Sequence, residues 1–421
     1  MPQILNVLFE ERVGGPQLRV LQVAQQLKER GYETIVALPK GDPHFARLLE
    51  RASIPFYEFD LVRLRRSLDL RLHLRFAARF GSNVAGLRSL IRQEEIGIVH
   101  TNGLMNLQAA LAARLEGAPL VWHINDVFTP PFLRAFLVPL VRRWASRIAV
   151  ASRAVADCCF RDRSAVEDRL QLLYAPVDVR EFHPGLSGAS VRQEFGIASD
   201  APVIGLVANV CPGKGHEYFL DAASLIQRRY PRAKFLVVGG KLENRCEFWD
   251  ALQEQTARLQ LERDVVFTGR RSDVPQLLRA MTVCVQASES EACPMAVLEA
   301  SACGLPVVAT NVGGTAEIVD RGVTGILIEP REPAQIARAV LRLLDSPGEA
   351  RQMGLAGAER MRERFSLERC VETHARMYDA VLHRAEFSVL PLRSTGALPA
   401  VPHCDDCAAV DDISERVHSR D

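Results

Sequence analysis

The sequence predicts an α/β protein made of two doubly wound domains, each built on a parallel sheet. Its 421 residues exceed the usual size of one domain. Short apolar runs alternate with helical patterns, which is typical of βαβ units. The alternation restarts after a stretch rich in Gly, Ser and Pro, and that composition indicates a linker.

The first domain is expected over residues 1–183. The first helix is expected from Pro16 to Arg30, because Gly31 ends it. Its apolar face is predicted to contain Leu18, Leu21, Ala24 and Leu27. Short apolar runs predict strands at 4–9, 34–38, 97–100, 120–123 and 147–151.

The linker is expected at residues 184–199, and the second domain at 200–364. Its strands are predicted at 202–209, 234–239, 265–269, 282–287 and 306–310. One helix is expected over 365–385, in a position that allows it to cross back to the first domain. The tail, 386–421, has scattered prolines and no sustained period, so we expect it to be poorly ordered.

Composition excludes some classes of protein. The chain has 52 basic and 51 acidic residues, a net charge of +1, which gives no signal for nucleic-acid binding. Ten cysteines are scattered, several inside apolar runs, which favours a reducing compartment. The N-terminus lacks the pattern of an export signal, and prolines and arginines interrupt the apolar stretch 132–150. We therefore expect a cytoplasmic protein, either free or peripheral on the inner face of a membrane.

The segment SESEACPMAVLEASACGLPVVAT, which begins at Ser288, carries the most information. A helix is predicted to start at Pro294 and to stop before Gly304. Glu291 precedes this helix and Glu299 lies one and a half turns inside it. Free amides at the helix N-terminus favour an anion such as diphosphate. Here the sequence resembles retaining GT-B glycosyltransferases of glycosyltransferase family 4, whose E-x7-E signature is matched by both glutamates.

The resemblance implies a GT-B fold, in which two Rossmann-like domains face each other across a cleft. It also implies that Glu299 binds the ribose hydroxyls of a nucleotide sugar and that Glu291 faces the donor sugar. Cys293 to Met295, with Pro294 between them, would hold the diphosphate at the helix N-terminus. The alternative is a pair of ordinary solvated glutamates.

Lys214 lies in NVCPGKGH, directly after a predicted strand. Gly213 and Gly215 flank it, so the backbone can approach a phosphate while the ammonium supplies charge. The segment looks like the family's phosphate-binding Arg and Lys pair, with Lys214 in the Lys position. Asn209 stands where the family has Arg, and it brings a hydrogen bond without a charge. The alternative for Lys214 is a solvated turn lysine.

Glu317 follows Gly313 and Gly314 in a segment that resembles the family's GG-x-x-E-x-I motif next to the donor. The glycines allow a tight turn after a predicted strand. Glu317 is equally well explained as an acidic residue in the first turn of a helix.

The first domain offers four further candidates. Gly14 and Gly15 follow the first strand and leave room for a diphosphate or an acceptor. The third glycine of a GxGxxG fingerprint is absent, which argues against a nicotinamide enzyme. His123 ends a strand and matches the family's histidine that contacts the transferred sugar, whereas a backbone-bonded strand-end histidine is the alternative. His100 also ends a strand and is a candidate on the acceptor side.

These patterns predict a glycosyltransferase that moves a sugar from a nucleotide sugar to a glycan or lipid-linked acceptor with retention. The catalytic candidates are His123, Lys214 and Glu291. No D-x-D occurs before the tail, and Cys404 with Cys407 gives too few ligands for zinc, so we expect neither a metal nor another cofactor.

Two other functions remain open at this point. One is a nucleotide-sugar epimerase, which would bind the donor without a second substrate. The other is a degenerate donor-binding subunit, because Asn209 and Ala175 replace an Arg and an Asn that are common in the family.

The segment 61–92 predicts contact with an anionic membrane. It holds eight arginines and one acid, Asp69, which gives a local charge of +7. Leucines and phenylalanines recur every three or four residues beside the basic face. The alternative is a helix packed on the domain with a solvated arginine face.

Overall fold

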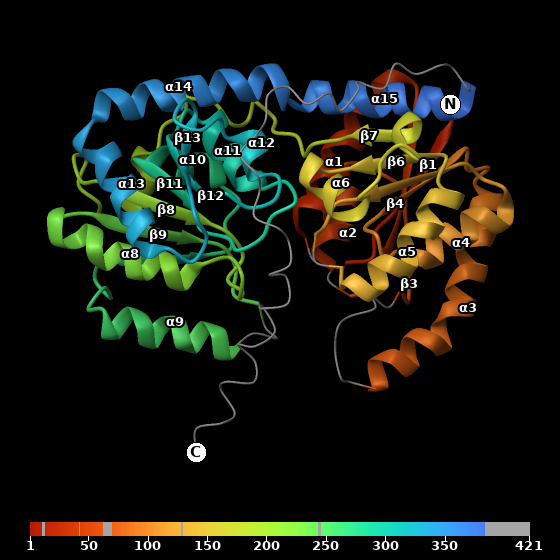
Figure 1. Cartoon of the computed structure of the whole chain (residues 1–421), viewed down its shortest axis with the longest axis horizontal. Helices are drawn as coiled ribbons and strands as arrows, with labels where there is room; N and C mark the ends of the chain where they lie inside the picture. Colours follow the sequence, from red (N-terminus) through yellow and green to blue (C-terminus); the bar gives the residue numbers. More distant parts are fainter. Residues whose placement is uncertain (11–12, 42, 62–69, 128, 243–245, 384–421) are drawn as a thin grey trace. The chain divides into compact units, whose positions relative to one another are not determined.

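The computed structural model describes residues 1–10, 13–41, 43–61, 70–127, 129–242 and 246–383. This part of the chain forms two compact units (Figure 1). Unit 1 contains Met1–Pro176 and helix α15 (Leu367–His383), and unit 2 contains Val177–Ser366. Each unit has one parallel sheet with helices between successive strands, so the predicted fold class of two doubly wound domains is confirmed.

The sheet of unit 1 has seven parallel strands in the order β3-β2-β1-β4-β5-β6-β7. The strands are β1 (Gln3–Val7), β2 (Glu33–Pro39), β3 (Phe56–Phe59), β4 (Ile98–Asn102), β5 (Leu120–Ile124), β6 (Arg147–Val150) and β7 (Leu170–Leu172). The sequence did not predict β3 and β7. Both are short edge strands, which leave few unpaired backbone groups at the edge of the sheet, and such short runs give a weak sequence pattern.

The helices of unit 1 are α1 (Gly15–Leu27), α2 (Pro43–Arg51), α3 (Leu70–Gln93), α4 (Leu107–Glu116), α5 (Pro131–Trp144), α6 (Arg153–Cys159) and α15, with 3-10 turns η1 (Lys28–Arg30) and η2 (Glu167–Arg169). Helix α1 packs against α15, and both contribute to one apolar core with β1 and β4. Ala24 and Leu27 of the predicted apolar face of α1 are buried, but Leu18 and Leu21 are only partly buried, whereas Arg19 is 4% exposed.

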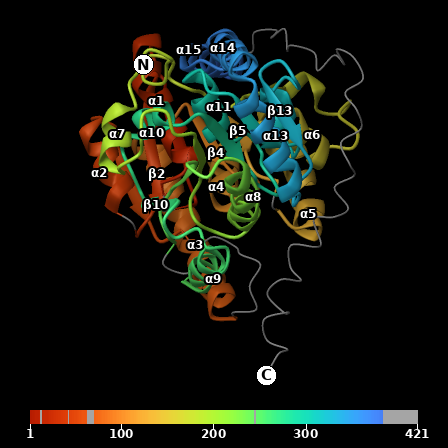
Figure 2. The same ribbon diagram turned by 90° about the vertical axis from the view of Figure 1, so that its left-hand side faces the viewer.

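The sheet of unit 2 has six parallel strands in the order β10-β9-β8-β11-β12-β13. The strands are β8 (Val203–Val207), β9 (Lys234–Val238), β10 (Val265–Gly269), β11 (Val283–Gln286), β12 (Val307–Thr310) and β13 (Gly325–Ile328). The helices are α7 (Ala189–Glu194), α8 (His216–Arg229), α9 (Cys246–Arg258), α10 (Val274–Ala280), α11 (Met295–Ala302), α12 (Thr315–Ile318), α13 (Pro333–Asp345) and α14 (Pro347–Arg364). Helix α8 lies beside α13, as both views show (Figures 1 and 2).

The segment predicted as a linker, 184–199, lies inside unit 2 and contains α7, which packs on α10. The chain passes from unit 1 to unit 2 earlier, between Pro176 and Val177. Residues 62–69 and the tail with its two cysteines lie outside the described residues. No helix in the described part of the chain is long and apolar enough to cross a membrane.

Candidate active site

Three loops that carry the sequence motifs lie together in unit 2. They follow β8, β11 and β12, which are neighbours in the sheet. The backbone amide of Glu289 donates to the carbonyl of Gly213 over 2.9 Å, and that of Gly314 donates to the carbonyl of Glu291 over 3.1 Å. The strand order reverses between β8 and β11, and ligands of doubly wound sheets bind at the carboxyl ends of strands at such a point.

Two glycines make this close approach of the loops possible. Gly215 has φ +71°, and a Cβ there would lie 2.0 Å from the carbonyl oxygen of Ala287. Gly313 has φ +48°, and a Cβ there would lie 1.8 Å from the carbonyl oxygen of Glu291. Any side chain would therefore both strain the backbone and push the loops apart.

Lys214 and Glu291 form an ion pair at the centre of these loops. The Lys214 Nζ atom lies 2.6 Å from Glu291 Oε1, which also accepts a 2.8 Å hydrogen bond from the Ser288 hydroxyl. Burial by itself would lower the pKa of the Lys214 ammonium, but the Glu291 carboxylate outweighs it and the pKa is raised. Lys214 is therefore a cation held close to a helix N-terminus, where an anionic ligand would compete with Glu291 for it.

Glu299 lies on α11, in the same unit. Burial, and then the charge of Glu181, raise the pKa of its carboxyl from 4.5 to about 8. The group is therefore mostly protonated at neutral pH, although ligand hydroxyls that donate to the carboxylate would favour its ionised form.

The N-terminus of α11 differs slightly from the prediction. Pro294 is the N-cap, with an extended ψ of 108°, and the helix begins at Met295. No side chain caps this end of the helix, and the neighbouring Cys293 is partly buried.

The structure also gives the positions of the remaining candidate residues. Asn209 is exposed and lies two residues after the end of β8. Glu317 lies on the four-residue helix α12, where its backbone carbonyl accepts a 2.9 Å bond from Arg360. In unit 1, Gly14 caps α1 and Gly15 begins it. The roles of these residues stay predictions.

His123 and His100 belong to a buried hydrogen-bonded cluster in unit 1. Arg19 Nη1 lies 3.1 Å from His123 Nε2, and His123 Nδ1 lies 3.2 Å from His100 Nε2. His100 Nδ1 lies 2.6 Å from the hydroxyl of Tyr378 on α15, and Arg19 also donates to Asn102 Oδ1.

The hydrogen-bond partners determine which ring nitrogen of His123 and of His100 carries the proton. A guanidinium only donates, so Nε2 of His123 must accept. A neutral His123 then carries its proton on Nδ1 and donates to His100, which in turn donates to Tyr378. Burial, followed by neighbouring Arg19 and the other histidines, holds the pKa of His123 well below its usual range, and the same effects lower that of His100. Both rings are therefore neutral, and both nitrogens of each have protein partners.

The sequence did not single out Arg19, Asn102, His374 or Tyr378. His374 stacks on His100 with ring centroids 5.8 Å apart, and burial lowers its pKa to about 3. The sequence offered one indication of this cluster, because Arg19 interrupts the apolar residues of α1. The contacts with α15 join residues more than 250 positions apart, which no local pattern can reveal.

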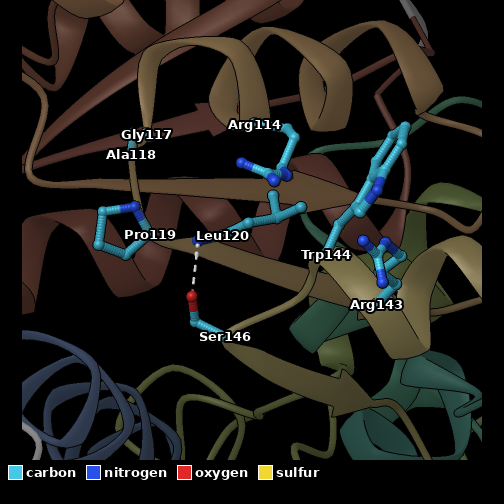
Figure 3. A pocket seen from close by; sticks show the side chains of 8 residues that line it. All are labelled: Arg114, Gly117, Ala118, Pro119, Leu120, Arg143, Trp144 and Ser146. Carbon is cyan, nitrogen blue, oxygen red and sulfur yellow. Dashed lines mark hydrogen bonds between the residues drawn. The ribbon is translucent and has the colours of Figure 1, made fainter.

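One cavity of unit 1 lies away from these residues. It measures about 480 Å³ and is lined by Arg114, Gly117, Ala118, Pro119, Leu120, Arg143, Trp144 and Ser146 (Figure 3). Leu120 begins β5 and Ser146 directly precedes β6, and the backbone amide of Leu120 donates a 3.2 Å hydrogen bond to the Ser146 hydroxyl, so the cavity lies at the amino edge of the sheet. His123 lies near the other end of β5.

Comparison with known proteins identifies the family. Residues 13–181 match the family model described as Glycosyltransferase Family 4, and residues 201–346 match that described as Glycosyl transferases group 1. The D-inositol 3-phosphate glycosyltransferase of Acidothermus cellulolyticus is 32% identical over 394 residues, which cover 88% of this chain and 87% of that protein. The chain belongs to glycosyltransferase family 4. It is therefore a transferase, and the epimerase alternative is not favoured.

Two further relatives are informative. A galactosyltransferase of Escherichia coli, named for UDP-Gal and α-D-GlcNAc-diphosphoundecaprenol, is 26% identical over 276 residues, or 62% of this chain and 70% of that protein. The crystal structure of Anabaena HepE with UDP and glucose superposes with a TM-score of 0.78 at 24% identity, covering 90% of this chain and all of HepE. The latter similarity confirms the GT-B fold.

Proposed function

We propose that this family 4 enzyme transfers a sugar from a UDP-sugar to a lipid-linked glycan, with retention at the anomeric carbon and without a metal. The observation that carries the proposal is the Lys214–Glu291 ion pair, held on neighbouring loops at the switch point of the unit 2 sheet. Both the HepE complex and the E. coli relative carry UDP or a UDP-sugar in their names.

In this proposal the diphosphate of the donor lies against Lys214 and the amides at the start of α11. Glu299 accepts hydrogen bonds from the ribose hydroxyls, and Glu291 faces the sugar. The bond from the anomeric carbon to the β-phosphate oxygen breaks while the bond to the acceptor oxygen forms on the same face. The acceptor proton passes to the departing phosphate oxygen. Lys214 stabilises the charge that develops on that oxygen, the role that a metal has in other transferases.

The first-domain candidates complete the proposal. His123, neutral and held by Arg19, orients groups near the transferred sugar, and Gly14 and Gly15 leave space at the end of β1. His100 stays a candidate on the acceptor side. Because no group of three or more His, Cys, Asp or Glu in the described residues is arranged to hold a metal ion, no metal role is assigned to this chain's residues.

A lipid-linked acceptor is supported by the name of the E. coli relative and by the basic segment 61–92. In the described part of that segment, Arg75 and Arg79 pair with Asp60, while Arg88 and Arg92 pair with Glu116. These acids lie outside the segment, so its effective charge is lower than its own sequence indicates. With this acceptor, the enzyme would act at the cytoplasmic face of a membrane.

The second candidate acceptor is a soluble phosphorylated polyol. It is favoured by the 32% identical relative, which is named for D-inositol 3-phosphate. Incubating the full chain with UDP-glucose or UDP-galactose and either undecaprenyl-diphosphate-linked GlcNAc or inositol 3-phosphate would distinguish the two. NMR of the product gives the anomeric configuration, and a chelator control tests the absence of a metal. Donor binding without transfer to either acceptor would instead support a degenerate donor-binding subunit.

A further inference from the structure

Helix α5 exposes apolar side chains where a surface helix normally exposes polar ones. Its sequence, PFLRAFLVPLVRRW, contains no acid and no uncharged polar residue other than the Trp indole. Its exposed residues are Pro131, Phe132, Ala135, Phe136, Pro139 and Arg143. Phe132 and Phe136 are 70% and 60% exposed and lie one turn apart, so they project from the same face. This face suits an apolar environment bordered by positive charge.

A basic cavity of about 740 Å³ adjoins this face. Four arginines line it together with Cys158 and Cys159, and none of its lining residues is acidic: the arginines are Arg134, Arg142, Arg143 and Arg161. The Nε atom of Arg142 is buried and has no hydrogen-bond partner among the described residues, although its Nη2 donates to the carbonyl of Asp162 over 3.0 Å. Four guanidinium groups around one cavity suit the oxygens of a phosphate ester.

The surroundings of these arginines differ from those of α3. Arg75 and Arg79 of α3 pair with Asp60, and Arg88 and Arg92 pair with Glu116. Close to α5, the carboxylate of Asp162 accepts a 2.9 Å hydrogen bond from the backbone amide of Ser164, and hydrogen bonding to Ser164, followed by the charge of Arg142, lowers its pKa. The cavity therefore keeps a positive charge without an acid in its lining. Helix α5 follows β5 in the chain after residues 125–130, so it begins on the side of the sheet where the carboxyl end of β5, with His123, lies.

We propose that the α5 surface, formed by Phe132, Phe136 and the four arginines of the cavity, docks unit 1 onto an anionic phospholipid bilayer. The phenylalanines enter the boundary between headgroups and acyl chains, and the arginines bind lipid phosphates. Docking would bring a lipid-linked acceptor to the edge that holds His123. The delivery of a lipid-linked acceptor rests on the proposed function, but the docking itself requires neither donor nor acceptor.

Co-sedimentation of the full chain with vesicles tests the proposal. We expect binding to vesicles of phosphatidylcholine with phosphatidylglycerol, weak binding to phosphatidylcholine alone, and release by salt. The F132S/F136S variant should lose binding to both. The R142Q/R143Q variant should bind anionic vesicles about 25-fold more weakly at low salt, because each arginine near such a surface contributes about fivefold.

Matched controls use exposed residues of unit 2. Leu355→Ser and Arg338→Gln should leave vesicle binding unchanged. Loss of binding in R75Q/R79Q with none in the α5 variants would overturn the proposal and assign the contact to α3. A dimer of the wild-type chain that F132S/F136S converts to a monomer, with no vesicle binding, would show that a second copy covers this face. Calorimetric donor binding, unchanged in all variants, separates failure of docking from failure of the proposed transferase chemistry.

Discussion

Replacing Glu299 with glutamine tests both the electrostatics and the proposed role of this residue. The folded state raises the pKa of the carboxyl from 4.5 to about 8. Below pH 4.5 the group is protonated in both the folded and the unfolded state and has no effect on the pH dependence. As the pH rises toward 8 the unfolded state alone ionises, so folding stability falls. At pH 7 this costs about 3 kcal/mol, and Glu299→Gln should recover much of it.

Donor binding should change in the opposite direction. If the ribose hydroxyls bind the carboxylate, only the ionised form of Glu299 binds well. The affinity of the wild-type protein for UDP-glucose or UDP-galactose should then rise about 50-fold between pH 6 and pH 8, with release of about 0.9 proton per donor at pH 7. Glu299→Gln should bind about 10- to 150-fold more weakly at pH 8, because a hydrogen bond to a charged group is lost, and its affinity should not depend on pH in this range.

Isothermal titration calorimetry in two buffers of different ionisation enthalpy measures both the affinity and the proton release. Glu181→Gln is the matched control, because removing this neighbouring charge should move the midpoint of the pH dependence to lower pH without removing the carboxylate. A wild-type affinity that is flat from pH 6 to 8, with no proton release, would refute the assignment of Glu299 to the ribose.

Three further changes test other parts of the site. Lys214→Ala should lower kcat about 100-fold or more, and Lys214→Arg less, because the position supplies charge to the leaving diphosphate; full activity of the alanine variant would contradict this role. Gly313→Ala should abolish donor binding in calorimetry, because the new Cβ would meet the Glu291 carbonyl. The control is Gly322→Ala, where φ is +78° and the Cβ would enter open space: it should lower the free energy of unfolding by only about 1 kcal/mol and keep the donor affinity. Arg19→Met should release the fixed tautomer of His123, seen by long-range ¹H–¹⁵N NMR of the histidine rings, and Arg19→Lys should keep it; a proton on Nε2 in the wild-type protein would show that the hydrogen-bond assignment is wrong.

Local sequence was enough to predict the two parallel sheets and the motif loops of unit 2. Strands such as β8 and β11 are short apolar runs, and Lys214 and Glu291 lie in the loops that follow them, so the topology of the sheet brings the two residues together. The sequence patterns failed to predict strands and helix ends where they were weak or ambiguous. The edge strands β3, β7 and β13, which the sequence did not predict, are short, and Pro294 has a φ that fits both an N-cap and a first helical residue.

The sequence by itself determined the fold class, the family resemblance and the residues of the motif loops, because these depend on periodicity and on spacing along the chain. Only the tertiary structure decided the environment of those residues. In the structure Arg19 contacts His123, and Tyr378 of α15 forms a hydrogen bond with His100. Arg75 and Arg88 of α3 form ion pairs with Asp60 and Glu116. These contacts set charge, protonation and exposure, and they depend on distances in space between residues far apart in the chain, which a local pattern does not contain.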